Sequence, residues 1–190
     1  MDLSVIAFLG LLLAVASLRL VELRISKRHQ KEMVARGAAK IDEPKFRWMV
    51  LLHTAVLLGA ALEVVLLRRR FIPWLAASMF VVFLAANAVR WWVIRSLGEH
   101  WNVQVMDSMR LGVVTSGPFR YVRHPNYAAV LAELLALPLI HTAWITAAVG
   151  AVAHFGVLAQ RLSTEERVLF ANPDYRAAMT GKPRFLPGLF

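Results

Sequence analysis

Long apolar blocks constrain the fold of this chain more than any other feature. Three of them cover residues 3–23, 46–67 and 73–94, and each is close to the ~20 residues that cross a bilayer as a helix. Two further blocks follow at 126–140 and 143–162. The first of these is too short to cross upright, so the pair predicts a helical hairpin that is tilted or partly re-entrant. We therefore expect an all-α polytopic membrane protein with about five transmembrane helices, including this C-terminal hairpin.

The composition agrees with a membrane protein. Hydrophobic residues make up 58% of the 190 positions, and the mean hydropathy is +0.56. A water-soluble domain of this length could not hide so much apolar surface. The first block has no basic segment before it and no small-residue cleavage site after it, so we expect no cleavable signal.

The basic residues predict an orientation. A net charge of +10 and a pI near 11 make nucleic acid a partner to consider, but the basic residues lie between apolar spans. Membrane orientation and anionic lipid headgroups explain them better, so we expect membrane lipids and no nucleic acid as partners. With the N-terminus outside, segments 24–47, 95–123 and 161–190 are cytoplasmic and hold 17 of the 22 lysines and arginines. This predicts an inner-membrane protein whose polar loops face the cytoplasm.

Cysteine is absent, which excludes disulfides, thiolate zinc sites and a cysteine nucleophile. His53, His141 and His154 are isolated and lack the spacing of a metal-ligand set. We interpret them as structural residues and assign no metal site.

The stretch 117–127 concentrates basic and aromatic residues between two apolar blocks. Pro118 predicts a turn. Pro125 disfavours helix at His124 and suits the first position of the helix that follows. Arg123 and His124 are then expected in a short extended segment, here called the lip, just before a helix N-terminus. Outward backbone N–H groups there favour an anion. The alternative is a basic turn that meets lipid phosphates.

Polar residues at membrane depth are candidates for function. Glu63 lies in the second span, and Asn87 and Arg90 lie one turn apart on one face of the third. For these three side chains we favour interhelical pairing. Glu133 faces either a ligand or its hairpin partner, and the sequence leaves both open.

Three expectations concern the ends of the spans. Arg19 and Glu22 are expected to reach the membrane interface by snorkelling, and residues 24–47 to form a polar loop. Trp101 either flanks a bound ligand or anchors the chain at the interface.

A polar helix is expected near the C-terminus. Ser163 resembles an N-cap followed by the acidic first-turn residues Glu165 and Glu166, and Pro173 is expected to interrupt this helix. Glu165 also stands four residues after Arg161, so a helix-surface ion pair between them is an alternative to a role in a site.

Four groups of residues carry a resemblance to a known family. In order and spacing over roughly residues 95–190 they resemble the isoprenylcysteine carboxyl methyltransferase family of membrane methyltransferases. Arg-His-Pro-x-Tyr occurs in related membrane enzymes too, but its combination with a pair of glutamates some forty residues later is specific. The four groups are Gly98-x-x-Trp101-x-Val103-Gln104; Val114-Thr115-Ser116-Gly117-Pro118-Phe119; Arg123-His124-Pro125-Asn126-Tyr127; and Glu165-Glu166-x-x-Leu169 followed by Tyr175 and Arg184-x-x-Pro187.

The resemblance implies a methyltransferase that uses S-adenosylmethionine in a pocket on the cytoplasmic side. Arg123 would steer the acceptor group, and Arg123, His124 and Glu166 are the expected catalytic residues. Tyr121 is a further aromatic candidate to flank the sulfonium or stack on adenine. The residues implied to line the cofactor are Gln104, Val113, His124, Tyr127, Glu165 and Glu166.

The same resemblance suggests that the two halves of the chain have different roles. Residues 1–94 would form three generic transmembrane helices, and 95–190 the catalytic region with cofactor loop, hairpin and C-terminal helix, within one structural unit.

The chemistry depends on the acceptor. A carboxylate acceptor is already ionised near pH 7, whereas a hydroxyl needs a base, for which His124 is the nearest candidate. The Ala, Arg and Val bias indicates a bacterial source, so the expected acceptor is a lipid that carries a carboxylate or hydroxyl, in prenyl-like or other lipophilic form.

Two other functions stay open from the sequence. Asn126 gives Arg-His-Pro-Asn-Tyr, a version seen in sterol-reductase-like membrane proteins, so an NADPH-dependent reductase of an unsaturated lipid is one alternative. The other is a non-catalytic scaffold that binds anionic lipid through segments 24–47 and 117–127.

Overall fold

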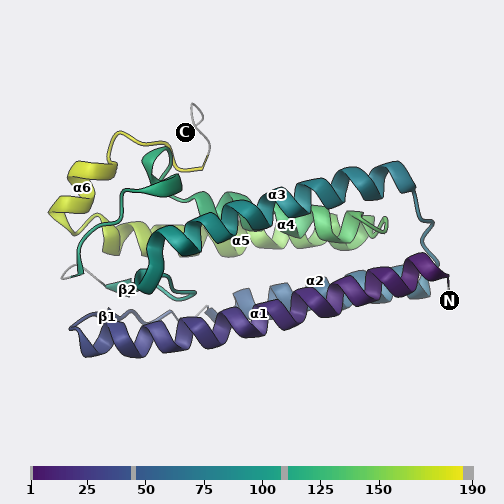
Figure 1. Cartoon of the computed structure of the whole chain (residues 1–190), viewed down its shortest axis with the longest axis horizontal. Coiled ribbons are helices and arrows are strands. Elements are labelled where there is room, and N and C mark those ends of the chain that lie inside the picture. The colour runs from purple at the N-terminus through teal and green to yellow at the C-terminus, as the bar shows by residue number, and fades with distance from the viewer. Residues whose placement is uncertain (1, 44–45, 108–110, 186–190) are drawn as a thin grey trace.

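The apolar blocks form helices that run side by side in a long bundle (Figure 1). A computed structural model describes residues 2–43, 46–107 and 111–185. The elements in chain order are α1 (Leu3–Ala35), β1 (Ala39–Lys40), α2 (Phe46–Leu66), α3 (Pro73–Leu97), η1 (Gly98–His100), β2 (Met106–Asp107), η3 (Gly117–Arg120), α4 (Pro125–Leu139), α5 (Trp144–Leu169) and α6 (Pro173–Met179).

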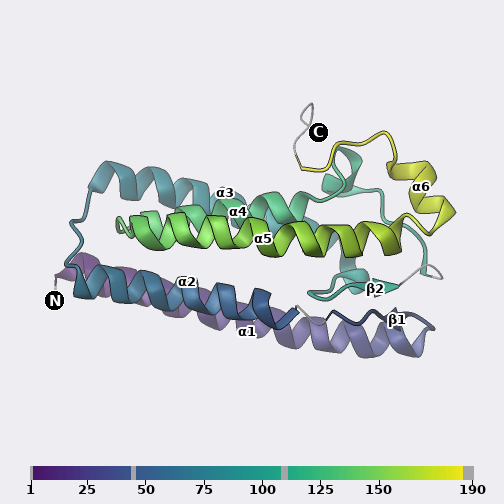
Figure 2. The same ribbon diagram turned by 180° about the vertical axis from the view of Figure 1, so that it is seen from behind.

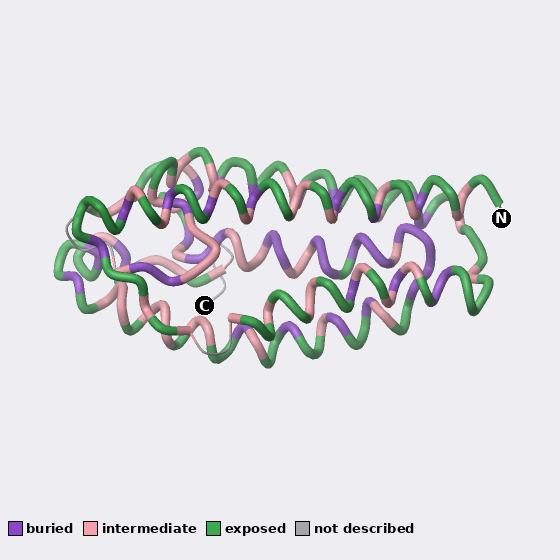
Figure 3. Tube along the Cα trace, turned by 90° about the horizontal axis from the view of Figure 1, so that it is seen from below, coloured by how far each residue is buried: buried purple, intermediate pink, exposed green. Residues whose placement is uncertain are grey.

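Helices α1 and α2 lie along one side of the bundle, and α3, α4 and α5 along the other, as Figures 1 and 2 both show. Among the described residues, α1, α2, α3 with η1, and α5 are long and apolar enough to cross a membrane. The shorter α4 packs against α3 and α5 and touches α2, and much of its surface is buried (Figure 3). The expected hairpin is therefore present, with α4 as its short inner arm.

Prolines set the starts of three helices. Pro73, Pro125 and Pro173 each stand in the first turn of a helix, where the missing N–H costs nothing and the fixed φ suits the helix. The expectation that Pro173 interrupts a helix is wrong, because it begins α6 instead. Asn172 caps α6 by accepting from the backbone N–H of Asp174 and Tyr175.

The apolar core lies between the two sides of the bundle at the end away from the loops. Small residues such as Ala60, Ala136 and Ala143 are almost fully buried there and allow close approach of the helices. Glu63 joins α2 to α5 at this end: its carboxylate accepts from the backbone N–H of Ile145 (3.1 Å) and Thr146 (2.7 Å) and pairs with Arg69 (2.7 Å). The prediction of interhelical pairing for Glu63 is confirmed.

Two sequence predictions about helix ends are wrong. Residues 24–47 are not a polar loop, because α1 continues to Ala35. Helix α5 likewise runs unbroken past Ser163, whose hydroxyl donates to the Gln160 carbonyl instead of capping a new helix. Pro187, part of the C-terminal motif, lies outside the described residues.

Candidate functional site

A cavity of about 540 Å³ lies beneath the loops that follow α3. Its walls come from all six α-helices and from the segment between η1 and α4. Six of the residues expected at a site line it: Gln104, Val113, Arg123, His124, Tyr127 and Glu165. The cavity continues between the helices, where most of its walls are apolar. The apolar side chains there include Leu20, Leu57, Val130 and Leu158, and the polar ones include Arg19, Glu22, His53, Arg90 and His154.

The two remaining expected residues do not line the cavity. Tyr121 is 53% exposed, on the turn that ends η3. Glu166 instead contacts three side chains: Arg123 (3.2 Å), His124 Nε2 (3.2 Å) and Arg184 (2.7 Å). A carboxylate of α5 therefore orients Arg123 and His124, the two residues that immediately precede α4.

The lip at the start of α4 differs from the sequence expectation. The backbone N–H groups of Arg123 and His124 do not point outward to an anion, because they donate to the carbonyls of Pro183 (2.9 Å) and Arg184 (2.8 Å). A segment 60 residues further along the chain thus covers the lip. The anion-binding capacity of this corner resides in side chains, not in these two backbone groups.

Tyr127, Glu165 and Arg161 form a second polar group on the cavity wall. The Tyr127 hydroxyl donates to Glu165, and Arg161 Nε donates to the Tyr127 oxygen at 2.9 Å. Arg161 also donates to the Val103 carbonyl at 2.5 Å. The alternative of a simple helix-surface pair between Arg161 and Glu165 is wrong, since Arg161 instead ties α5 to α4 and to the loop after η1.

The extension of α1 shapes the loop that carries Gln104. Gln30 Nε2 donates to both Asn102 Oδ1 and Gln104 Oε1, each at 2.8 Å, and Ser26 donates to Asn102 at 2.9 Å. Sequence reasoning missed Ser26 and Gln30. The signal was available in their helical spacing of four residues within a segment interpreted as a loop.

Two further side chains complete the walls. Trp101 is 3% exposed and lines the cavity, so it is not an exposed interfacial anchor. Tyr175 reaches the cavity from α6. Burial, and then the nearby Glu165, raise the pKa of its phenol well above the usual range, so Tyr175 stays protonated and neutral.

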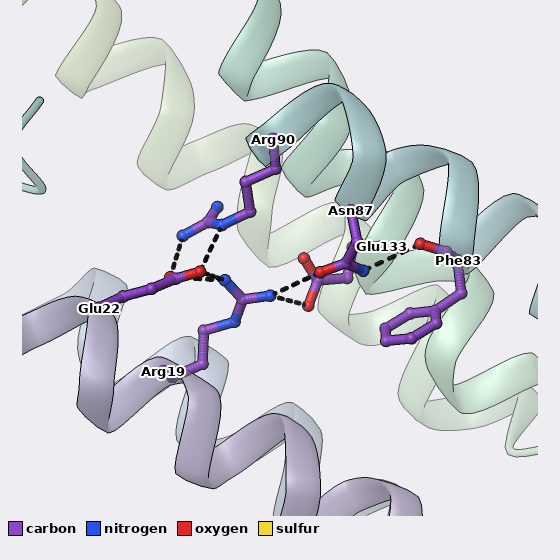
Figure 4. Close-up of polar contacts among 6 residues, drawn as sticks. All are labelled: Arg19, Glu22, Phe83, Asn87, Arg90 and Glu133. Atoms are coloured by element: carbon purple, nitrogen blue, oxygen red, sulfur yellow. Dashed lines mark hydrogen bonds and ion pairs between the residues drawn. The ribbon is translucent and has the colours of Figure 1, made fainter. Parts of the chain in front are cut away.

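A buried ionic network crosses the bundle at membrane depth (Figure 4). Arg19 pairs with Glu22 (2.6 Å) and with Glu133 (2.7 Å), and Arg90 pairs with Glu22 (2.6 Å). Asn87 accepts from Arg19 at 3.3 Å. Interhelical pairing is confirmed for Asn87 and Arg90.

This network corrects two expectations. Glu133 faces neither a cofactor nor its hairpin partner α5, because its partner is Arg19 on α1. Arg19 and Glu22 do not snorkel to the interface either. Their side chains point into the bundle toward α3 and α4 (Figure 4), and Glu22 is only 2% exposed.

The three histidines that the sequence leaves isolated lie in two different parts of the bundle. His53 and His154 pack edge to face across α2 and α5, and both line the cavity. His141 lies between Phe8 and Phe71 at the other end of the bundle. Among the described residues, no group of three or more His, Asp or Glu side chains is placed to hold a metal ion.

These features define a class: a helical membrane protein with a polar site that opens into an apolar cavity between its helices. The chain belongs to the isoprenylcysteine carboxyl methyltransferase (ICMT) family, whose model matches residues 77–171. The family consists of membrane methyltransferases that use S-adenosylmethionine, and the general kind of enzyme is therefore a membrane methyltransferase.

Similar proteins agree with this placement. The chain is 27% identical to the uncharacterized protein YpbQ of Bacillus subtilis, over 80% of this chain and 89% of that protein. It is 29% identical to an uncharacterized protein of Haemophilus influenzae, over 82% and 90%. The fold resembles the eukaryotic intramembrane Ras methyltransferase ICMT, with a TM-score of 0.56 at 18% identity, over 70% of this chain. The chain spans about half the length of that solved protein.

Proposed function

We propose that this protein transfers a methyl group from S-adenosylmethionine to a carboxylate or hydroxyl of a lipophilic acceptor. The observation that carries the proposal is that one continuous cavity has a polar end and a largely apolar part. Its polar end holds His124, Tyr127 and Glu165, and its apolar part runs between helices past Leu57 and Leu158. A polar cofactor and a lipid-like acceptor can therefore meet in one enclosed space.

The side chains at the polar end fit the groups of this cofactor. His124 suits the cofactor carboxylate, which leaves Arg123, whose Nε is buried without a hydrogen-bond partner, for the acceptor. Glu165 and Gln104 suit hydroxyl and amino groups. The faces of Tyr127 and Trp101 suit a sulfonium cation.

Bound there, the cofactor supplies an electrophilic methyl group. Transfer breaks its bond to sulfur and forms a bond to the acceptor oxygen, which requires alignment and exclusion of water more than a strong acid or base. Arg123 would hold an acceptor carboxylate in a charge-assisted pair, and no proton moves. With a hydroxyl acceptor, His124 Nδ1 would take the proton, because Nε2 already donates to Glu166 at 3.2 Å, and the Glu166 carboxylate would stabilise the resulting imidazolium.

Glu166 acts in this proposal as a positioning residue. It lies outside the cavity walls and bonds Arg123, His124 and Arg184 at once. The C-terminal segment contributes to the same corner through the Arg184 side chain.

Calorimetric titration with S-adenosylhomocysteine tests the cofactor assignment. We expect saturable binding to the purified wild type, and about ten- to a hundred-fold weaker binding to Glu165→Gln, because one charge-assisted hydrogen bond is lost. Glu32→Gln is the matched control, since Glu32 lies on the exposed part of α1, and it should bind like the wild type. Binding of NADPH without S-adenosylhomocysteine would replace the proposal by a reductase. Binding of neither would favour a lipid-binding scaffold.

We further propose that the site faces the cytoplasm of a cell whose inner membrane holds the protein. The absence of cysteine allows a clean test with a membrane-impermeant maleimide. Two single-cysteine variants serve for this. Lys31→Cys places a cysteine at the end of the bundle that carries the site, and Arg68→Cys places one at the opposite end, both at exposed positions. Labelling of the first only in inside-out vesicles, and of the second only in right-side-out vesicles, supports the orientation. The reverse pattern contradicts it.

A further inference from the structure

Buried polar atoms without partners gather in the cavity. Among the described side chains such atoms occur in Arg123, Asn126, His141 and His154. All of these residues except His141 line the cavity. Buried polar groups in folded proteins nearly always have hydrogen-bond partners, so unpartnered ones in residues that line a cavity are candidates to bond a ligand.

His154 is the most informative of them. It is 4% exposed, and neither of its ring nitrogens has a partner. A neutral imidazole carries one donor and one acceptor, so this ring has both left unpaired beside the cavity. The ionic network does not satisfy it, because the arginines of that network already pair with Glu22 and Glu133.

His53 faces His154 across the cavity wall. Their ring centroids are 6.2 Å apart in an edge-to-face arrangement. His53 Nδ1 donates to the Met49 carbonyl at 2.7 Å, which in a neutral ring leaves Nε2 as an acceptor. The walls near this pair include the apolar Leu57 on α2 and Leu158 on α5, and the ionic network of Arg19 and Arg90 lies beside His53.

The position of His154 along α5 sets its distance from the polar end of the cavity. His154, Leu158, Arg161 and Glu165 follow at helical spacing, and all four line the cavity. At about 1.5 Å per residue, His154 lies roughly 10 Å along the helix from Arg161 and roughly 16 Å from Glu165. An acceptor whose reacting group lies near Glu165 therefore reaches His154 only if it is elongated.

We propose that His154, assisted by His53, forms a second polar subsite that binds a hydroxyl or carbonyl oxygen within the hydrophobic body of the acceptor. This inference rests on the proposed function and narrows the substrate class. The acceptor is an elongated lipid that carries an oxygen function roughly 16 Å from its reacting group, not a plain hydrocarbon chain. A hydrocarbon chain would leave both nitrogens of His154 unpaired in the complex.

A matched pair of probes tests the subsite. Octadecanoic acid and its derivative with a hydroxyl on the fourteenth carbon differ only by one oxygen on the chain. Their affinities are measured by calorimetry on the detergent-solubilised protein saturated with S-adenosylhomocysteine. We expect the wild type to bind the hydroxylated probe about ten-fold more tightly, the ratio for one hydrogen bond made away from water.

The variants separate the subsite from general packing. His154→Leu should abolish the preference and leave the affinity for octadecanoic acid nearly unchanged. His154→Gln, which keeps a donor and an acceptor, should retain part of it. His141→Leu is the matched control, because His141 is also buried with an unpartnered nitrogen but lies outside the cavity, and it should keep the full preference.

Failure of this inference is distinct from failure of the proposed function. If S-adenosylhomocysteine does not bind, the cofactor assignment is wrong. If it binds but the wild type shows no preference for the hydroxylated probe, or does not bind that probe, the subsite alone is overturned. A preference that survives in His154→Leu overturns it as well.

Discussion

Glu22→Gln tests the buried ionic network directly. Glu22 pairs with Arg19 and Arg90, each at 2.6 Å, and Arg19 in turn pairs with Glu133. Two guanidinium groups and two carboxylates thus balance in charge at membrane depth. The substitution keeps the size of the side chain, but Arg19 then has Glu133 as its carboxylate partner, and Arg90 loses the carboxylate with which it pairs.

The expected loss of stability is large. Removal of one partner from a buried ion pair costs about 3–5 kcal/mol, because a charge is left buried without compensation. The glutamine oxygen still accepts a hydrogen bond, so we take the lower end, about 3 kcal/mol. For a chain of this size each kcal/mol lowers the melting temperature by roughly 2–4 °C, which gives a decrease of about 6–12 °C.

Thermal unfolding in detergent, followed by the fluorescence of the six tryptophans, measures this decrease. The control is Glu32→Gln, which removes the exposed Arg28–Glu32 pair on the same helix. Exposed pairs at this spacing contribute about 0.3–0.5 kcal/mol, so the shift should stay below about 2 °C. Adding Arg90→Met to Glu22→Gln restores the charge balance and should recover part of the loss. Equal shifts for Glu22→Gln and Glu32→Gln would refute the network as the link from α1 to α3 and α4.

Two further predictions concern the links between elements. Glu63→Gln should destabilise the protein by about 1.5–3 kcal/mol, since Glu63 makes charged hydrogen bonds to the start of α5; an unchanged melting temperature would contradict this role. Gly117→Ala should destabilise by at least about 1–2 kcal/mol, because Gly117 has a φ of +61° and its added Cβ would lie 2.0 Å from Ser96 Oγ. Gly112→Ala, at a φ of +87° in open space, should cost less, and an equal loss would exclude the Ser96 clash.

The helices could be predicted because local signals fix them. Apolar blocks of membrane length give α2 and α3 almost to the residue, and Pro73 and Pro125 mark helix starts that need no tertiary information. The motif around His124 likewise places the residues of a cavity wall, because the start of α4 is defined by Pro125.

The errors arise where distant segments decide the outcome. Glu133 has its partner on a helix 114 residues earlier, and no local pattern reports that distance. The α1 extension is held by Asn102 and Gln104 through Ser26 and Gln30, so its polar sequence resembles a loop when read alone. Glu166 was expected on the cavity wall, but Arg184 binds it from a segment outside the helices.

The contact of the C-terminal segment with the residues just before α4 has a consequence for biosynthesis. Pro183 and Arg184 can reach the backbone of Arg123 and His124 only after the hairpin of α4 and α5 has inserted and the chain has turned back. Because chains emerge from the ribosome N-terminus first, this corner of the cavity is completed after all the spanning helices of the described segment are synthesised. A substitution that delays insertion of α5 would therefore reduce the yield of binding-competent protein even if it touches no residue of the site.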